Sequence, residues 1–188
     1  IDLISEICVK TNIWLHIDGS IGGIFAITSI PLDGIKYINK ANSITINPQK
    51  ILGITKTSSL LLVSNFEILK KTFSTGLPYV SSGDNIINRG ELGVQGSRPA
   101  EIIKLWLGLR FLGMKGIIDI LGSSIDRKNF LENNLDKNKY EIYSGPLHII
   151  SFLPKGMSQI DSDSWTMNTK IMLMKKNFML SRPIFKNR

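Results

Sequence analysis

The chain has 188 residues, 43% of them hydrophobic, and a mean hydropathy of +0.08, values typical of a globular protein with one core and at most a small second domain. The net charge is +8, but the basic residues are scattered and form no arginine-rich run, which argues against nucleic-acid binding. No apolar run approaches the roughly 20 residues that span a bilayer, and the single cysteine, Cys8, excludes an internal disulfide and fits a reducing, cytoplasmic compartment.

The first half is predicted to alternate helices and strands. Apolar residues recur at helical spacing over 1–10, and the run IWLHID at 13–18 has the profile of a strand buried on both faces. The β-branched run SITIN at 43–47 and SLLLVSN at 59–65 are further strands, and Asn65 is placed to start the helix FEILKKTF. This order predicts an α/β architecture with helices covering a sheet.

The second half has a different texture. Residues 74–98 are rich in Gly, Ser and Asn, which predicts a functional or disordered connection. EIIKLWLGLRFLG at 101–113 predicts a helix that is apolar nearly all round and ends at Gly113. A polar helix around 126–134, the two strands YEIYSG and LHIISFLP, and a final strand around 177–181 predict a small α+β domain.

Two charged residues follow predicted strands. Asp18 ends the first strand, and Lys50 stands three residues beyond the second, after an Asn-Pro pair. The ends of neighbouring parallel strands form one rim, where α/β sheets bind ligands. Asp18 could equally be a helix N-cap or a turn residue. A shared rim would let the two side chains serve one ligand.

Pyridoxal phosphate requires this pair of groups. Its aldehyde forms a Schiff base with a lysine, and its ring nitrogen must stay protonated to draw electrons from the substrate. A carboxylate against that nitrogen favours the protonated form. Such a spacing of Asp18 and Lys50 also arises by chance, so the pair alone does not establish the cofactor.

Three blocks of sequence resemble a known family. WLHIDGSIGG resembles WxHxDAAxGG, SITINPQKILG resembles DSxxxNPHKWxG, and VQGSRPAEIIKLWLGLRFLG resembles QCGRRxDxxKLWLxLRxxG, in the order found in the group II pyridoxal-phosphate-dependent amino-acid decarboxylases. The resemblance implies the type I fold of these enzymes. Residues 1–103 would be the C-terminal part of the large, mainly parallel-sheet domain, and 104–188 the small α+β domain.

The resemblance also implies roles for residues of the first two blocks. Lys50 would be the Schiff-base lysine, Asp18 the partner of the pyridine nitrogen, and Asn47 a contact of the phosphate. His16 matches the motif's histidine, whose alternative is a structural residue packed in the sheet. Ser20 would lie against the cofactor ring.

Three further assignments rest on the third block and the loop before it. Ser97 matches a residue on a turn that reaches the partner subunit's phosphate, and Arg98 one that contacts a substrate carboxylate, although an arginine beside a helix start can be purely structural. Tyr79, in PYV, matches the loop tyrosine that returns a proton to the α-carbon. The alternative for Tyr79 is a loop aromatic that only packs.

The chain departs from the family pattern at several positions. Gly19 and Ser20 replace two alanines, Asn42 replaces an acid, and Gln49 replaces the histidine before the lysine. The family chain is more than twice as long, so we expect this piece, which lacks an initiating Met, to be inactive alone and to expose a sheet edge.

The resemblance therefore predicts decarboxylation of an L-amino acid to an amine and carbon dioxide, in a homodimer with interface sites. Two alternatives stay open: another enzyme of the same fold, such as an aldehyde synthase or a lyase, and a non-catalytic decarboxylase-like subunit.

Overall fold

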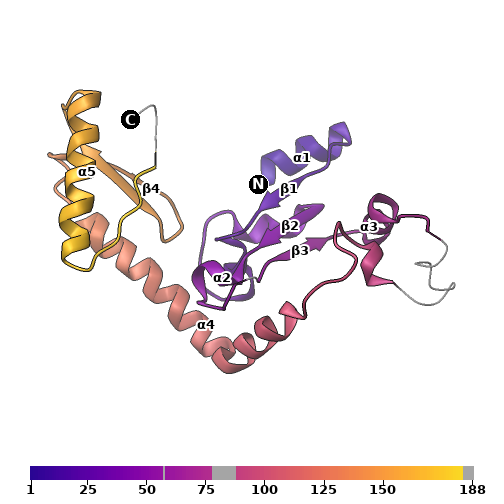
Figure 1. Cartoon of the computed structure of the whole chain (residues 1–188). Helices are drawn as coiled ribbons and strands as arrows, with labels where there is room; N and C mark the ends of the chain where they lie inside the picture. Colours follow the sequence, from indigo (N-terminus) through magenta and orange to yellow (C-terminus); the bar gives the residue numbers. More distant parts are fainter. Residues whose placement is uncertain (57, 78–87, 184–188) are drawn as a thin grey trace. The chain divides into compact units, whose positions relative to one another are not determined.

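The computed structural model describes residues 1–56, 58–77 and 88–183 (Figure 1). The chain divides into two compact units, Ile1–Ser123 and Ser124–Arg188. Helices combine with a three-stranded and a two-stranded sheet in the described residues, in agreement with the predicted mixture of helices and strands. The domain boundary suggested by the sequence, between residues 103 and 104, stays a prediction.

The first helix, α1 (Asp2–Thr11), confirms the helix predicted over residues 1–10. Asn12 ends it with a left-handed conformation (φ 53°), which asparagine adopts more readily than most residues. The apolar stripe that predicted the helix is exposed: Leu3, Ile4, Ile7 and Val9 are all more than half accessible. The helical periodicity therefore predicted the helix correctly. Its apolar side chains, however, are not covered by the described residues.

The first unit contains a three-stranded sheet in the order β1-β2-β3, with β1 (His16–Asp18), β2 (Ser43–Ile46) and β3 (Leu60–Val63). All three strands were predicted, although each is shorter than its sequence pattern. β1 pairs with β2 in parallel, and β3 pairs with β2 in antiparallel fashion. This part of the sheet is therefore mixed, and its parallel pair, β1 and β2, carries the strand ends that lead to Asp18 and Lys50.

The burial predicted for β1 is wrong. Both His16 and Asp18 are exposed, and Ile17 is half-buried. β1 is an edge strand in the described part of the sheet, so it has a ladder partner on one side only. Its apolar run therefore does not make it a strand covered on both faces here.

Two short 3-10 helices, η1 (Gly23–Ile27) and η2 (Ile35–Lys40), connect β1 to β2. Phe25 on η1 is fully buried, and Ile24 beside it is buried as well. A Cβ atom on Gly23 would lie 2.9 Å from Cγ1 of Ile46 on β2, so only glycine allows η1 to pack this closely against the sheet. The core of the first unit therefore forms directly behind the strand that leads to Lys50.

The helix predicted after Asn65 is confirmed as α3 (Phe66–Phe73). The Asn65 side chain accepts a hydrogen bond from the Glu67 N–H at 3.1 Å, which is the expected action of an asparagine N-cap. The next described element along the chain is a further 3-10 turn, η3 (Arg89–Glu91).

The apolar helix predicted over 101–113 is the first part of α4 (Glu101–Asn134). Gly113 interrupts α4 with φ 59° and ψ 178°, a conformation that favours glycine and matches the predicted helix end. The helix resumes beyond Gly113 and includes the polar segment predicted around 126–134. Leu105 is buried, whereas Trp106 and Phe111 are exposed at 59% and 90%, so the part of the chain that the structure describes does not cover the apolar helix on several sides.

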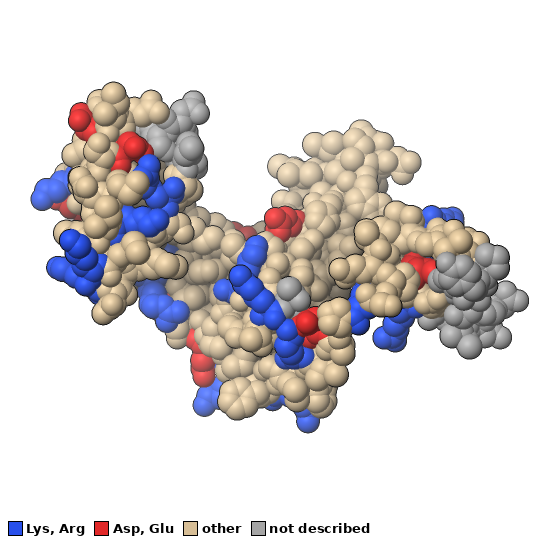
Figure 2. Space-filling model, viewed as in Figure 1, with Lys and Arg blue, Asp and Glu red and all other residues tan. Residues whose placement is uncertain are grey.

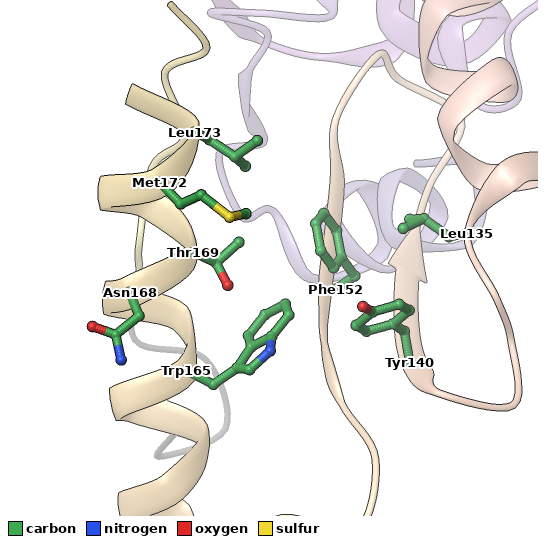
Figure 3. Close-up of a pocket in the computed structure, with 8 residues that line it drawn as sticks. All are labelled: Leu135, Tyr140, Phe152, Trp165, Asn168, Thr169, Met172 and Leu173. Atoms are coloured by element: carbon green, nitrogen blue, oxygen red, sulfur yellow. The ribbon is translucent and has the colours of Figure 1, made fainter. Parts of the chain in front are cut away.

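The second unit contains an antiparallel hairpin of β4 (Tyr140–Ser144) and β5 (Ile150–Pro154), as predicted. A third element, α5 (Gln159–Lys175), packs against it. The Tyr140 ring lies edge-on to Phe152 and tilted against Trp165, with both centroid distances at 5.7 Å. A hollow of about 580 Å³ lies between α5 and the hairpin, and Figure 3 labels the side chains that line it. Its lining residues are Leu135, Tyr140, Phe152, Trp165, Asn168, Thr169, Met172 and Leu173.

The strand predicted around residues 177–181 is wrong, and α5 was missed. Asn177 has a left-handed φ of 63°, and the Phe178 N–H donates to the Leu173 carbonyl at 2.9 Å. These features terminate a helix rather than extend a strand. The side of α5 that lines the hollow includes residues 165, 169, 172 and 173. Charged and polar residues between them interrupt the apolar spacing in the sequence, so the pattern did not predict a helix.

The charged side chains do not gather into one basic patch on the face drawn in Figure 2, where lysine and arginine groups are separated by acidic and uncharged surface. Within the described ranges, no helix has both the length and the apolar character needed to cross a membrane.

Candidate active site

Asp18 lies at the carboxyl end of β1, where the chain leaves the sheet, opposite Thr45 of β2. Its Oδ1 atom accepts a hydrogen bond from the Ser20 N–H at 3.0 Å, which closes a short turn around the carboxylate. The pKa of Asp18 is lowered from its ordinary 3.8, first by this backbone bond, then by the Ser20 hydroxyl and the positive charges of Lys50 and His16, while desolvation acts in the opposite direction. The exposed carboxylate is therefore held in its ionised form.

Lys50 lies on α2 (Pro48–Ile51), the single helical turn that follows β2. Pro48 occupies the start of this turn, where its fixed φ and missing N–H favour a helix beginning. The Lys50 side chain is exposed, and its Nζ atom donates a hydrogen bond to Ser20 Oγ at 2.9 Å. The chain therefore turns at the Asn-Pro pair, and the Lys50 amine reaches Ser20, just beyond the end of the neighbouring strand.

The acid and the amine predicted from the sequence meet at one residue. The Ser20 backbone binds the Asp18 carboxylate, and the Ser20 hydroxyl accepts from the Lys50 amine. Both groups are accessible from solvent. The two strand ends therefore bring both side chains to Ser20, while their chemical roles remain predictions.

The turn that carries Lys50 is anchored on both sides. The Asn47 N–H donates to the Ser20 carbonyl at 3.2 Å, and Asn47 Oδ1 accepts from the Ser59 hydroxyl at 3.0 Å. Gln49 Oε1 accepts from the Ser58 N–H at 2.6 Å. Gln49, a departure from the family pattern, thus ties the lysine turn to the segment before β3.

His16 is held by two hydroxyl groups of β2. Its Nδ1 atom lies 2.8 Å from Ser43 Oγ, and its Nε2 atom lies 3.2 Å from Thr45 Oγ1. Ser43 Oγ also accepts from the Trp14 indole N–H at 2.8 Å. The histidine is therefore exposed yet fixed, and the role implied by the resemblance stays a prediction beside the structural one.

Ser43 and Thr45 were not predicted as site residues. They alternate along β2 and so share a face, but only the register of the β1–β2 ladder places them against His16. The serine of the lysine motif was visible in the sequence, whereas its partner could not be identified without that register.

Gly19, the first of the two departures after Asp18, lies buried in the turn. A Cβ atom there would lie 2.9 Å from the Thr45 carbonyl oxygen and 3.1 Å from Gly23 Cα. Both are backbone atoms, so relief would require the strand and the following turn to move. The family pattern, with alanine at this position, would instead suggest that alanine is tolerated.

We expect Gly19→Ala to destabilise the complete protein by about 1–3 kcal/mol, the usual effect of overpacking a close contact, as measured by urea unfolding. A matched control is Gly145→Ala, since a Cβ at that position meets no atom within 4 Å. Equal stabilities for the two variants would contradict the close approach at Gly19.

The remaining predicted residues lie on other segments. Ser97 is exposed, and Arg98 donates from Nε to the Gln95 carbonyl at 3.0 Å and from Nη2 to the Arg89 carbonyl at 3.3 Å. Among the described residues, no hydrogen bond or ion pair joins Ser97 or Arg98 to the turn around Asp18. Tyr79 lies outside the described residues. The described ranges contain no group of three or more His, Cys, Asp or Glu side chains that could hold a metal ion.

Comparison with known proteins identifies a family for most of the chain. Residues 1–150 match the model described as the pyridoxal-dependent decarboxylase conserved domain. The acidic amino acid decarboxylase GADL1 of Mus musculus is 28% identical over 145 residues, which are 74% of this chain and 26% of that protein. The aromatic-L-amino-acid decarboxylase of Bacillus atrophaeus is 27% identical over 167 residues, 85% of this chain and 35% of that protein.

Solved structures show the same fold. The Catharanthus roseus tryptophan decarboxylase, solved in complex with L-tryptophan, superposes with a TM-score of 0.82 at 21% identity, over 100% of this chain and 41% of that one. The chain spans well under half the length of the proteins it resembles.

Proposed function

The chain belongs to the family of pyridoxal-dependent decarboxylases, and from this premise we propose that the complete protein converts an L-amino acid to its amine and carbon dioxide. The observation that carries the proposal is the meeting of the Lys50 amine and the Asp18 carboxylate at Ser20. Relatives named for acidic and for aromatic substrates are about equally similar, so the proposal stops at the class of L-amino acids.

The donor set at this turn fits pyridoxal phosphate. Lys50 offers an exposed primary amine, and Asp18 offers a carboxylate whose lowered pKa keeps it ionised. When bound, the cofactor supplies an aldehyde that joins to an amine and a protonated pyridine ring that accepts electrons. We propose that Lys50 attaches it, Asp18 pairs with its ring nitrogen, and Asn47 helps hold its phosphate.

The other residues of the chain have supporting roles in this proposal. His16 orients the cofactor from its fixed position on β1, and Tyr79 returns a proton to the α-carbon after carbon dioxide leaves. Arg98 contacts a substrate carboxylate. Its hydrogen bonds to two backbone carbonyls use Nε and Nη2, and because a guanidinium has five N–H donors, other N–H groups remain for the substrate. Ser97 and Tyr79 serve the site of the second subunit in a cytoplasmic homodimer.

The direct test uses the complete protein supplied with pyridoxal phosphate. We expect the visible absorbance band of a lysine-linked cofactor and the release of carbon dioxide with amine from one member of a panel of L-amino acids. A band with aldehyde as product would favour an aldehyde synthase of the same fold. A protein that develops no band would contradict the proposal and favour a non-catalytic subunit.

Tyr79→Phe separates the decarboxylase from the aldehyde-forming alternative. Removing the phenolic proton donor is expected to lower amine formation by about 10²-fold, within the usual contribution of general acid catalysis, while the cofactor band persists. The measurement is the ratio of amine to aldehyde per carbon dioxide released. Tyr37→Phe, on η2, is the control, and an unchanged ratio and rate in Tyr79→Phe would remove Tyr79 from the mechanism.

A further inference from the structure

Ser20 occupies a position where the family pattern has alanine, and it contacts both charged groups of the proposed site. Its backbone N–H donates to Asp18 Oδ1, and its hydroxyl oxygen accepts from the Lys50 amine. Two separate parts of one residue therefore fix the acid and the amine. An alanine would keep the first contact and lose the second.

We propose that the Ser20 hydroxyl is a positioning group that holds the Lys50 amine in register with the Asp18 carboxylate. This inference rests on the proposed function, because it concerns how the lysine presents its amine to the cofactor. Ser20 acts through Lys50 and Asp18, so it is a positioning residue.

The direction of the hydrogen bonds supports this role. A lysine ammonium can only donate, so the Ser20 oxygen must accept from it and the hydroxyl proton remains available for another acceptor. The Asp18 carboxylate can serve as that acceptor, since the Ser20 hydroxyl is one of the causes of the lowered pKa of Asp18. A hydroxyl that accepts from the Lys50 amine and donates to a carboxylate would bridge two opposite charges, an arrangement in which each bond strengthens the other.

The surrounding structure limits how far Ser20 can move. The Ser20 carbonyl accepts from the Asn47 N–H at 3.2 Å, which links it to the residue before the lysine turn. Gly19, directly before it, is buried against the Thr45 carbonyl. Ser20 is itself only partly exposed. A hydroxyl on so constrained a backbone can define the position of a long, flexible lysine side chain.

The test measures the chemical reactivity of Lys50 and does not require activity. The complete protein, treated with hydroxylamine to remove any cofactor, is pulsed with acetic anhydride, and acetylation of Lys50 relative to the exposed Lys10 is quantified by mass spectrometry. In the Ser20→Ala variant, we expect Lys50 to be acetylated about two- to tenfold faster than in the unmodified protein, because the amine has lost one hydrogen bond. Ser20→Thr, which keeps the hydroxyl, should restore the slower rate.

Ser59→Ala is the matched control, because it removes a hydroxyl that bonds Asn47 on the same turn without touching Lys50. Its Lys50 acetylation should equal that of the unmodified protein. If Ser20→Ala does not fold, Ser20→Cys provides the comparison, since its thiol is a much weaker acceptor, and faster acetylation is again the expected result.

Two results would overturn the role of Ser20. Lys50 acetylation that is unchanged by loss of the hydroxyl would show that no bond restrains the amine. Equal rates for the Ala and Thr variants would show a purely structural effect. Either result with an intact cofactor band leaves the proposed function standing, whereas absence of that band in the unmodified protein contradicts the proposed function independently of the acetylation rates.

Discussion

Replacing Lys50 with alanine in the complete protein is expected to lower decarboxylation by at least about a thousandfold, as expected when a group that forms the covalent link to a cofactor is lost. The lysine-linked absorbance band should disappear at the same time. Lys50 is exposed and lies on a single turn, so its truncation removes no core contact. With the cofactor removed from both proteins, we expect the unfolding transition of the variant to lie close to that of the unmodified protein.

The control for this experiment is Lys56→Ala. Lys56 is a nearby exposed lysine whose backbone carbonyl accepts from Lys104 at 2.6 Å, a contact that its side-chain truncation preserves. It should keep both the band and the activity. A Lys50→Ala protein that still forms the band, with Lys56→Ala losing it, would show that the cofactor is attached elsewhere.

Asp18→Asn is expected to lower turnover by about 10²-fold or more while leaving the cofactor linked. Asparagine keeps an oxygen that can accept from the Ser20 N–H, so the turn is preserved, but it removes the negative charge that would favour a protonated pyridine. The measurement is steady-state decarboxylation together with the absorbance band. Full activity in this variant would exclude the pairing of Asp18 with the ring nitrogen.

The pH dependence of the same enzyme provides a second check on Asp18. Its pKa is below 3.8, mainly because of the Ser20 backbone bond, with further lowering by the Ser20 hydroxyl and by Lys50 and His16. A lowered pKa means that more than half of the Asp18 carboxylates are still charged at pH 3.8, and the charge is lost as the pH falls through the folded-state pKa. We therefore expect the midpoint of any acid limb caused by Asp18 to lie below pH 3.8, and a limb with a higher midpoint should persist in Asp18→Asn.

Sequence patterns predicted the elements of the fold better than their surroundings. The helical spacing over 1–10, the cap at Asn65 and the helix end at Gly113 were all correct because each depends on local backbone chemistry. The burial of β1 depends on which elements lie beside it, and that information is not local. The strand expected at 177–181 failed for a different, local reason, because a left-handed Asn177 ends a helix there.

The candidate site shows the same division. The position of Asp18 and Lys50 followed from where two parallel strands end. The contacts of Ser20 with Asp18 and Lys50 could not be predicted in this way. The family pattern has alanine at this position, and the resemblance implied only a contact with the cofactor ring. The partners of His16 depend on the register between β1 and β2, and the carbonyl contacts of Arg98 depend on the path of an irregular loop.

The hydroxyl groups around His16 have a consequence for the orientation of its ring. Ser43 and Thr45 can each donate or accept a hydrogen bond, so both ring nitrogens keep a partner whichever of them carries the proton. Trp14 restricts this choice only at Ser43, where its indole N–H occupies one lone pair. The imidazole is therefore fixed in one orientation at an exposed position on β1, and the β2 hydroxyls keep it there in either tautomer.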